Sequence, residues 1–153
     1  MAVYFIDSSA LVKRYINEIG SGYVLKIFNP SLNNEVFIAS ITGVEIIAAI
    51  TRRSRGGSIN TADAAFLSNQ FRNDYQTDYQ IIEITENIIT QAIQLAETYA
   101  LRGYDAVQLA VACAVNQLCV ANGLSLMLIS ADNELNIAAS LEGLSVENPN
   151  NHP

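Results

Sequence analysis

The sequence predicts an α/β fold in which helices cover both faces of a central, mainly parallel sheet. Short, almost wholly apolar runs alternate with longer stretches in which apolar residues recur at helical spacing. Strands of this kind are buried on both faces, as they are in parallel sheets. Half of the 153 residues are hydrophobic and only 15% are charged, so the chain can bury a full core. We expect one domain over residues 1–148 and a polar tail over residues 149–153.

Apolar runs and turn residues place the elements in chain order. The expected strands span residues 3–6, 36–39, 81–84 and 126–129, and residues 144–146 are a candidate edge strand. Between them we expect helices over residues 9–16, 42–53, 61–75, 104–120 and 133–141, and a helical stretch around residues 23–28. Thr85 begins one more, amphipathic helix. One side of that helix carries an apolar stripe: Ile88, Ile89, Ala92, Ile93 and Ala96.

The most apolar segment, residues 106–115, is half the length of a membrane span, which needs about 20 apolar residues. We therefore expect a buried central helix and no contact with a membrane. The chain begins directly with an expected strand and has no basic region before it, so the sequence predicts no signal peptide. A cytoplasmic location is the corresponding expectation.

Cysteine and histidine offer no zinc or nucleophilic site. Cys113 and Cys119 are six residues apart on one expected helix, where they face different directions and cannot be bridged. The single histidine, His152, lies in the polar tail. A zinc site with these ligand types and a cysteine–histidine pair are therefore not expected.

The net charge of −7 argues against tight, sequence-independent binding of nucleic acid. The eight basic residues are clustered, however, with Lys13 beside Arg14 and three arginines between residues 52 and 55. Several acids are candidate metal ligands, whose charge a bound cation would offset. The acidity of the chain therefore does not exclude a nuclease.

Acidic residues occur where expected strands end and helices begin. Asp7 follows the first strand, Asp132 follows the fourth, Asp105 begins the central helix, and Glu45 lies early in the helix after the second strand. Taken singly, the three aspartates are explained more simply as helix N-caps, each contributing about 1 kcal/mol. Two pairs also have capping-box spacing: Thr42 with Glu45, and Asp105 with Gln108.

Taken together, the four acids predict a metal-binding active site. In parallel sheets, ligands bind beyond the carboxyl ends of the strands, which is where Asp7 and Asp132 would meet. Converging carboxylates repel one another and take up protons unless a cation offsets their charge. Mg²⁺ or Mn²⁺ suits such an all-oxygen site and activates water for phosphodiester hydrolysis. We therefore predict Asp7, Glu45, Asp105 and Asp132 as catalytic and metal-ligating residues.

Four further residues are candidate contacts to substrate or to a ligand water: Ser8, Ser130, Arg102 and Arg52. Both serines are equally suited to capping a helix. Arg52 belongs to a cluster at the end of an expected helix, where arginine also complements the helix dipole. Arg102 lies within one helical turn of Asp105, so either a phosphate or an acidic side chain suits it.

Four segments resemble PIN domains, and especially the VapC-like toxins of that family. They are YFIDSSALVK (residues 4–13), TGVEI (residues 42–46), GYDAVQLA (residues 103–110) and SADNEL (residues 130–135). The resemblance implies a three-layer α/β/α sandwich and an Mg²⁺- or Mn²⁺-dependent endoribonuclease with the four acids around the metal. It also implies an RNA substrate, frequent homodimers, and a small antitoxin that wraps the toxin within a type II toxin–antitoxin pair.

Two other uses of acids at strand ends fit poorly. A phosphoacceptor receiver domain needs paired acids after the first strand and a late lysine, but Lys13 and Lys26 are both early. An aspartyl phosphatase usually has a second aspartate two residues after the first, where this chain has Ser9. Two alternatives within the PIN fold remain open: a nuclease of RNA processing without a toxin role, and a catalytically silent module that binds protein.

Overall fold

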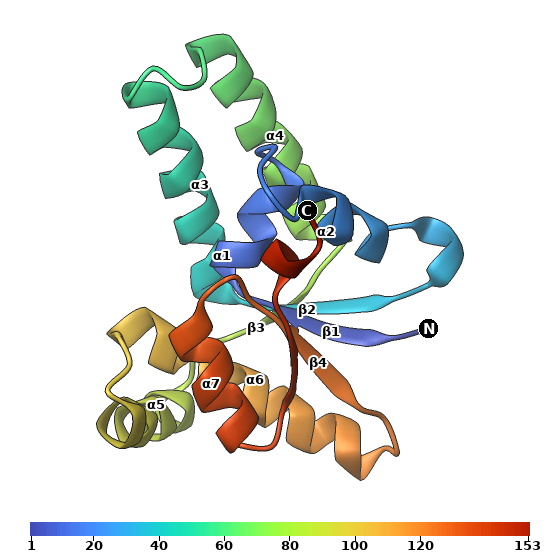
Figure 1. Ribbon diagram of the computed structural model, residues 1–153, viewed down its shortest axis with the longest axis vertical. Coiled ribbons are helices and arrows are strands. Elements are labelled where there is room, and N and C mark those ends of the chain that lie inside the picture. Colours follow the sequence, from blue (N-terminus) through green and yellow to red (C-terminus); the bar gives the residue numbers. More distant parts are fainter.

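The computed structural model describes residues 1–153 and contains five parallel strands between two layers of helices (Figure 1). The strand order is β3-β2-β1-β4-β5. The expected α/β/α sandwich is therefore confirmed, and its sheet is wholly parallel. The strands are Val3–Ile6 (β1), Glu35–Ala39 (β2), Gln80–Ile82 (β3), Leu126–Ile129 (β4) and Ser145–Glu147 (β5).

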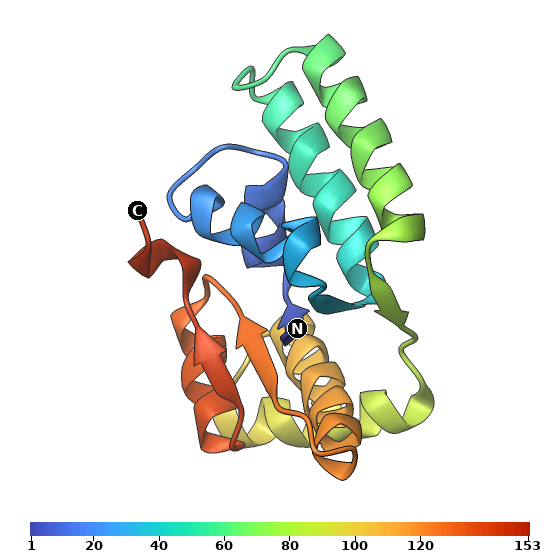
Figure 2. The ribbon, with the colours of Figure 1, turned by 90° about the vertical axis from the view of Figure 1, so that its right-hand side faces the viewer.

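The helices divide between the two faces of the sheet. One layer comprises Ser8–Leu11 (α1), Ser21–Ile27 (α2), Ser40–Arg55 (α3) and Thr61–Thr77 (α4). The other comprises Glu86–Tyr99 (α5), Gly103–Ala121 (α6) and Asn133–Leu141 (α7). Figure 2 shows that α3 and α4 form a hairpin whose far end projects well beyond the sheet. Three short 3₁₀ turns complete the chain: Val12–Arg14 (η1), Pro30–Leu32 (η2) and Pro149–Asn151 (η3).

Each face of the sheet has its own hydrophobic core, because successive strand residues point to opposite faces. In β1, Val3 and Phe5 join the core beneath α5, α6 and α7, whereas Ile6 joins the core beneath α1 to α4. In β4, Leu128 and Ile129 divide in the same way. This two-sided burial explains why β1 and β4 are apolar throughout rather than alternating with polar residues.

The central helix α6 is long and apolar enough, by length and composition alone, to cross a membrane. Here it is the core helix of a folded domain, packed against α5, β2 and β4. Leu109, Ala110 and Val111 are fully buried, and Val115 is nearly so. The apolar segment over residues 106–115 is thus largely buried inside the protein, as the sequence predicted, whereas Leu118 and Val120 near the end of the helix are exposed.

Three details of the expected elements are wrong. The helix over residues 9–16 is instead the short α1 followed by η1, and this tighter turn buries Lys13, whose ammonium pairs with Glu18 at 3.0 Å. The third strand ends at Ile82, two residues before its expected end. On α5, Ile89 and Ile93 are 42% and 58% exposed, because the buried row follows the spacing of Ile88, Ala92 and Leu95 instead.

The polar tail packs against the N-terminal half of the chain. Pro149 is buried, and the ring of His152 stacks on Tyr23 with centroids 4.2 Å apart. Gly20, just before α2, has a φ of +86°, and a Cβ there would lie 2.5 Å from the carbonyl oxygen of Pro149. The close approach of the tail to α2 therefore requires glycine at this position.

We expect Gly20→Ala to destabilise the protein more than Gly57→Ala. Both glycines have positive φ, at which alanine costs about 1 kcal/mol, but Gly57 has open space around its Cα. Gly20→Ala should lose a further ~1–2 kcal/mol of unfolding free energy, as expected for overpacking, because its Cβ would clash with the tail backbone. Urea unfolding of the two variants measures it, and equal losses would show that the tail contributes no packing there.

Candidate active site

The candidate site lies where the direction of strand order reverses. From β1 the chain builds outward to β2 and β3, then returns to add β4 and β5 on the other side of β1. The carboxyl ends of β1 and β4 are therefore adjacent, and the backbone N–H of Asp7 donates to the carbonyl of Ile129 at 3.1 Å. Such reversal points are the usual ligand sites of open parallel sheets.

Asp7 is buried at the junction of β1, α1 and β4. Its Oδ1 accepts from the backbone N–H of Ala10 at 3.0 Å, so it caps α1 as expected. The hydroxyls of Ser9 and Ser130 donate to the same carboxylate at 2.7 and 2.8 Å. Burial nevertheless raises the pKa of Asp7 to about 7, and the nearby charge of Asp105 adds to this increase.

Glu45 is held from both sides by neutral donors. Ser8, on α1, donates its hydroxyl to Oε2 at 2.7 Å, and Gln108, on α6, donates its amide to Oε1 at 3.0 Å. The carboxylate is thereby fixed between the first and the central helix. Thr42 does not cap α3, because this helix begins earlier, at Ser40; its hydroxyl is buried and accepts from Gln108 at 2.9 Å. The expected capping box of Thr42 with Glu45 is therefore wrong.

Asp105 lies inside the first turn of α6, and its side chain is half-buried. The N-cap position belongs to Arg102, so Asp105 is not a cap, and its expected capping box with Gln108 is also wrong. Burial raises the pKa of Asp105 to about 6, with further increases from Asp132 and Glu45 and an opposing effect of Arg102. The pKa of Asp105 therefore depends on Glu45, on α3, and on Asp132, at the start of α7.

Asp132 caps α7, as its position after β4 suggested. Its Oδ1 accepts from the backbone N–H of Leu135 at 2.9 Å, and its own N–H donates to the hydroxyl of Ser130 at 3.1 Å. Ser130 thus links Asp132 to Asp7. Because Ser130 is fully buried, it orients these two acids and does not contact a substrate.

An open cavity of about 480 Å³ brings most of the expected site residues together. Its walls include three of the four acids and three of the four accessory residues: Glu45, Asp105, Asp132, Ser8, Arg52 and Arg102. Asp7 is only 2% exposed and does not line it. Neither arginine forms an ion pair, so both guanidinium groups are available at the rim.

The donor chemistry of this cavity fits a hard divalent cation. No three acidic, histidine or cysteine side chains stand close enough to form a compact metal-binding group in the present arrangement. The cavity nevertheless holds the carboxylates of Glu45, Asp105 and Asp132, and repulsion from Asp132 and Glu45 contributes to the raised pKa of Asp105. A bound cation would offset that repulsion, and carboxylate oxygens are the ligands that Mg²⁺ and Mn²⁺ prefer.

Two residues that the sequence analysis did not select hold the acids in place. Ser9 donates to Asp7, and its Oγ also accepts from the backbone N–H of Ala131 at 3.0 Å, so it joins α1 to the segment after β4. Gln108 donates to Glu45 and Thr42, while its own Oε1 is buried without a partner. An unpaired buried acceptor costs about 1–3 kcal/mol.

The amide orientation of Gln108 follows from its neighbour. A carboxylate only accepts hydrogen bonds, so the amino group must face Glu45, and the carbonyl oxygen is left unpaired. The hydrogen bond that holds Glu45 therefore comes with a destabilising feature, the unpaired buried carbonyl oxygen of Gln108. The signal in the sequence was a polar residue within the most apolar helix, one turn after Asp105.

Comparison with known proteins identifies the chain's relatives. A family model described as the PIN domain matches residues 4–140. Ribonuclease VapC45 of Mycobacterium tuberculosis is 28% identical over 115 residues, which cover 75% of this chain and 78% of that protein.

Solved structures with the same fold cover nearly the whole chain. PAE2754 from Pyrobaculum aerophilum superimposes with a TM-score of 0.65 at 19% identity, covering 98% of this chain and 91% of its own. VapBC2 from Rickettsia felis was solved bound to a DNA fragment from its promoter. It superimposes with a TM-score of 0.63 at 15% identity, covering 95% of this chain and 98% of its own. At these identities the likeness establishes the fold.

The buried Asp7 makes the stability of the metal-free protein depend on pH. Its folded pKa of about 7 exceeds the ordinary value of 3.8, so the folded state loses stability as pH rises between these values. An asparagine side chain at this position would not titrate and would still cap α1. We expect the free energy of unfolding of the wild type to rise by roughly 2–3 kcal/mol, relative to that of Asp7→Asn, as the pH falls from about 8 to about 5.

Urea unfolding in EDTA, at several pH values, measures this difference. A difference that does not vary with pH would show that Asp7 titrates normally in the folded protein.

Proposed function

This chain belongs to the PIN-domain family, and on that basis we propose that it is a divalent-metal-dependent endoribonuclease and the toxin of a type II toxin–antitoxin pair. The observation that carries the proposal is the cavity at the β1–β4 junction. Glu45, Asp105 and Asp132, contributed by three separate elements, face this one cavity above the buried Asp7. The relatives named as VapC ribonucleases support the same activity.

The four acids would hold Mg²⁺ or Mn²⁺, which when bound polarises a phosphoryl oxygen and lowers the pKa of water. Hydrolysis adds one water molecule across a P–O bond of RNA. The water oxygen bonds to phosphorus and loses a proton, and the leaving ribose oxygen takes up a proton. In the metal-free protein the pKa of Asp105 is raised to about 6, mainly by burial and then by Asp132 and Glu45, and a bound cation would hold this carboxylate in its ionised, ligating form.

The remaining residues would position these groups and the substrate. Ser9 and Ser130 orient Asp7, and Ser8 and Gln108 orient Glu45. All four are neutral, so they add no repulsion to the cavity. At the rim, the unpaired guanidinium groups of Arg52 and Arg102 are placed to contact phosphates of the RNA backbone: both line the cavity and both are exposed.

The partners follow from the relatives. Several proteins of similar fold were solved as VapBC toxin–antitoxin complexes. We infer that this chain also binds a small antitoxin protein, and that it forms a homodimer in the cytoplasm. Large exposed apolar side chains on α5, α6 and α7 are compatible with such contacts: Ile89, Ile93, Leu118, Val120, Ile137 and Leu141.

We expect purified protein to cleave RNA from a mixed pool in Mg²⁺ or Mn²⁺, and Asp105→Asn to reduce this cleavage by at least about a hundredfold. EDTA should abolish cleavage by the wild type. Glu97→Gln is the matched control, because it removes an exposed carboxylate on α5 that does not line the cavity. Circular dichroism checks that each variant is folded.

Cleavage that persists in EDTA would contradict the metal requirement. A folded wild type that neither cleaves any pool nor binds Mn²⁺ in calorimetry would overturn the nuclease assignment. It would favour a PIN fold that serves only to bind protein.

A second prediction concerns Gln108 as a positioning residue. Gln108→Leu removes the donor to Glu45 at similar volume, and we expect Mn²⁺ affinity and cleavage to fall by about tenfold. Gln108→Glu keeps the shape but sets a negative charge against Glu45, so its loss should be larger. Gln117→Leu, at an exposed position of the same helix, is the control. Equal effects of leucine and glutamate on Mn²⁺ affinity would indicate a packing role alone.

A further inference from the structure

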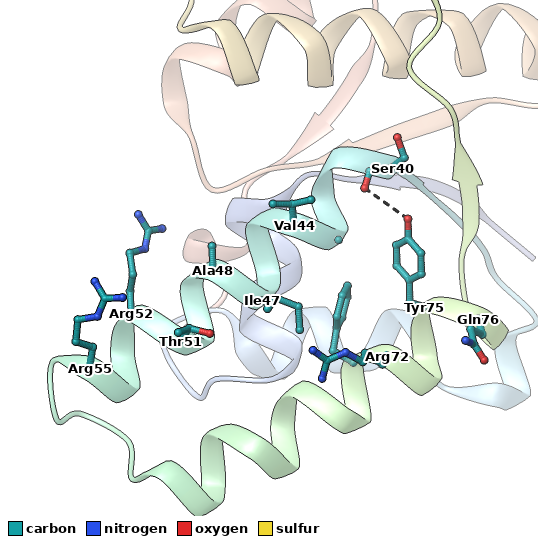
Figure 3. A pocket seen from close by; sticks show the side chains of 12 residues that line it. Ser40, Val44, Ile47, Ala48, Thr51, Arg52, Arg55, Arg72, Tyr75 and Gln76 are labelled. Atoms are coloured by element: carbon teal, nitrogen blue, oxygen red, sulfur yellow. Dashed lines mark hydrogen bonds between the residues drawn. The ribbon is translucent and has the colours of Figure 1, made fainter.

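A second and larger cavity, a groove of about 740 Å³, runs between α3 and α4 (Figure 3). Its floor is largely apolar, with Ile47 on α3 and the rings of Phe71 and Tyr75 on α4. Arg52 and Arg55, near the end of α3, and Arg72, on α4, also line it. None of its lining residues is acidic, although the chain has 15 acidic and only 8 basic residues.

The basic residues of the chain divide into paired and unpaired groups. Lys13 and Arg53 pair with Glu18, and Arg14 pairs with Asp74 and Asp78. Five basic residues have no carboxylate partner: Lys26, Arg52, Arg55, Arg72 and Arg102. Four of these five line either the groove or the carboxylate cavity. In a chain of net charge −7, this concentration of unpaired cations indicates an anionic ligand.

The groove and the carboxylate cavity meet along one ridge of α3. Val44, Ala48 and Arg52 line both of them. Because these residues are four positions apart, they form a single row on the helix surface. Ala48 is small and exposed, so the ridge is low at its middle. The guanidinium of Arg52 lies at the end of this row and serves both cavities.

We propose that this groove binds the single-stranded RNA that flanks the cleavage position, with Arg52, Arg55 and Arg72 contacting its phosphates. The inference rests on the proposed nuclease function and extends it to the path of the substrate. RNA that reaches the carboxylate cavity is repelled by its acids, and the groove supplies the compensating positive charge beside them. Ribose and base can lie against the apolar floor, as they do in grooves that bind single strands without sequence preference.

Continuity with the carboxylate cavity favours RNA over an acidic protein segment. An RNA strand bound at the acids can cross the low ridge at Ala48 and continue into the groove. One ligand therefore occupies both the carboxylate cavity and the groove. Its phosphates are also spaced along the whole path, which suits guanidinium groups on two helices. An acidic protein segment would use the same charges but would gain nothing from the shared ridge.

The test is the equilibrium binding of fluorescein-labelled, mixed-sequence single-stranded RNA in EDTA, measured by anisotropy over a range of salt concentrations. The double variant Arg55→Gln/Arg72→Gln should bind at least about tenfold more weakly than the wild type at low salt. Its plot of log affinity against log salt should be flatter by about 1.4, because each phosphate that the protein neutralises on a single strand adds about 0.7 to the slope. Lys26→Gln removes the one unpaired cation outside both cavities, so its affinity should stay within about twofold of the wild type.

The outcomes separate this inference from the nuclease assignment. If the wild type cleaves RNA but the double variant keeps its affinity and salt slope, the groove assignment is overturned and the nuclease stands. If the double variant keeps its RNA affinity but loses binding of labelled poly-glutamate, the groove selects acidic protein, which also overturns the proposal. If the wild type neither binds nor cleaves RNA, both inferences fail.

Discussion

The buried carboxylate of Asp7 joins the three segments on which the site is built. It follows β1, caps α1, and accepts a hydrogen bond from Ser130 after β4, so a single side chain joins parts of the chain that are 123 residues apart. The parallel pairing of β1 with β4 makes this contact possible, because it brings their carboxyl ends to one edge. The hydrogen bonds satisfy the carboxylate but do not cancel the cost of burying its charge. The carboxylate that completes the fold is therefore left with an unfavourable buried negative charge at the site.

The chain distributes its few positive charges in two distinct ways. Lys13, Arg14 and Arg53 form internal ion pairs, which join η1 and the segment after it to the α3–α4 hairpin. The remaining cations are left free, mostly along the two sides of α3. Net charge is therefore a poor guide to the ligands of this protein, because the local charge beside the carboxylates is opposite in sign to the whole.

Periodicity was sufficient to predict the sheet, the order of the elements and the edge at which the acids meet. Buried strands and long helices produce strong patterns, and a parallel sheet leaves only one edge for residues that follow its strands. The capping of α1 and α7 by Asp7 and Asp132 was likewise visible, because a cap depends only on local spacing.

The networks within the site were not predictable in this way. Both capping-box interpretations failed, because Thr42 and Gln108 meet each other across two helices that are 66 residues apart in sequence. Local spacing carries no information about such a contact, and the same residues satisfy the local pattern by chance. The α3–α4 groove was equally invisible, since Arg72 is distant in sequence from the cluster at residues 52–55.

A consequence follows from α3 being one unbroken helix from Ser40 to Arg55. Glu45 and the arginines at its far end are carried by a single rigid rod, so their relative directions are set by the number of residues between them. Inserting or deleting one residue between Glu45 and Arg52 would turn the arginines by about 100° around the helix axis while leaving every side chain chemically intact. The length of this segment is therefore under the same constraint as its residues. A substitution at an exposed position of this segment, such as Ala48, leaves the directions of the other side chains unchanged, whereas an insertion or deletion of one residue would separate the acids from the cations in one step.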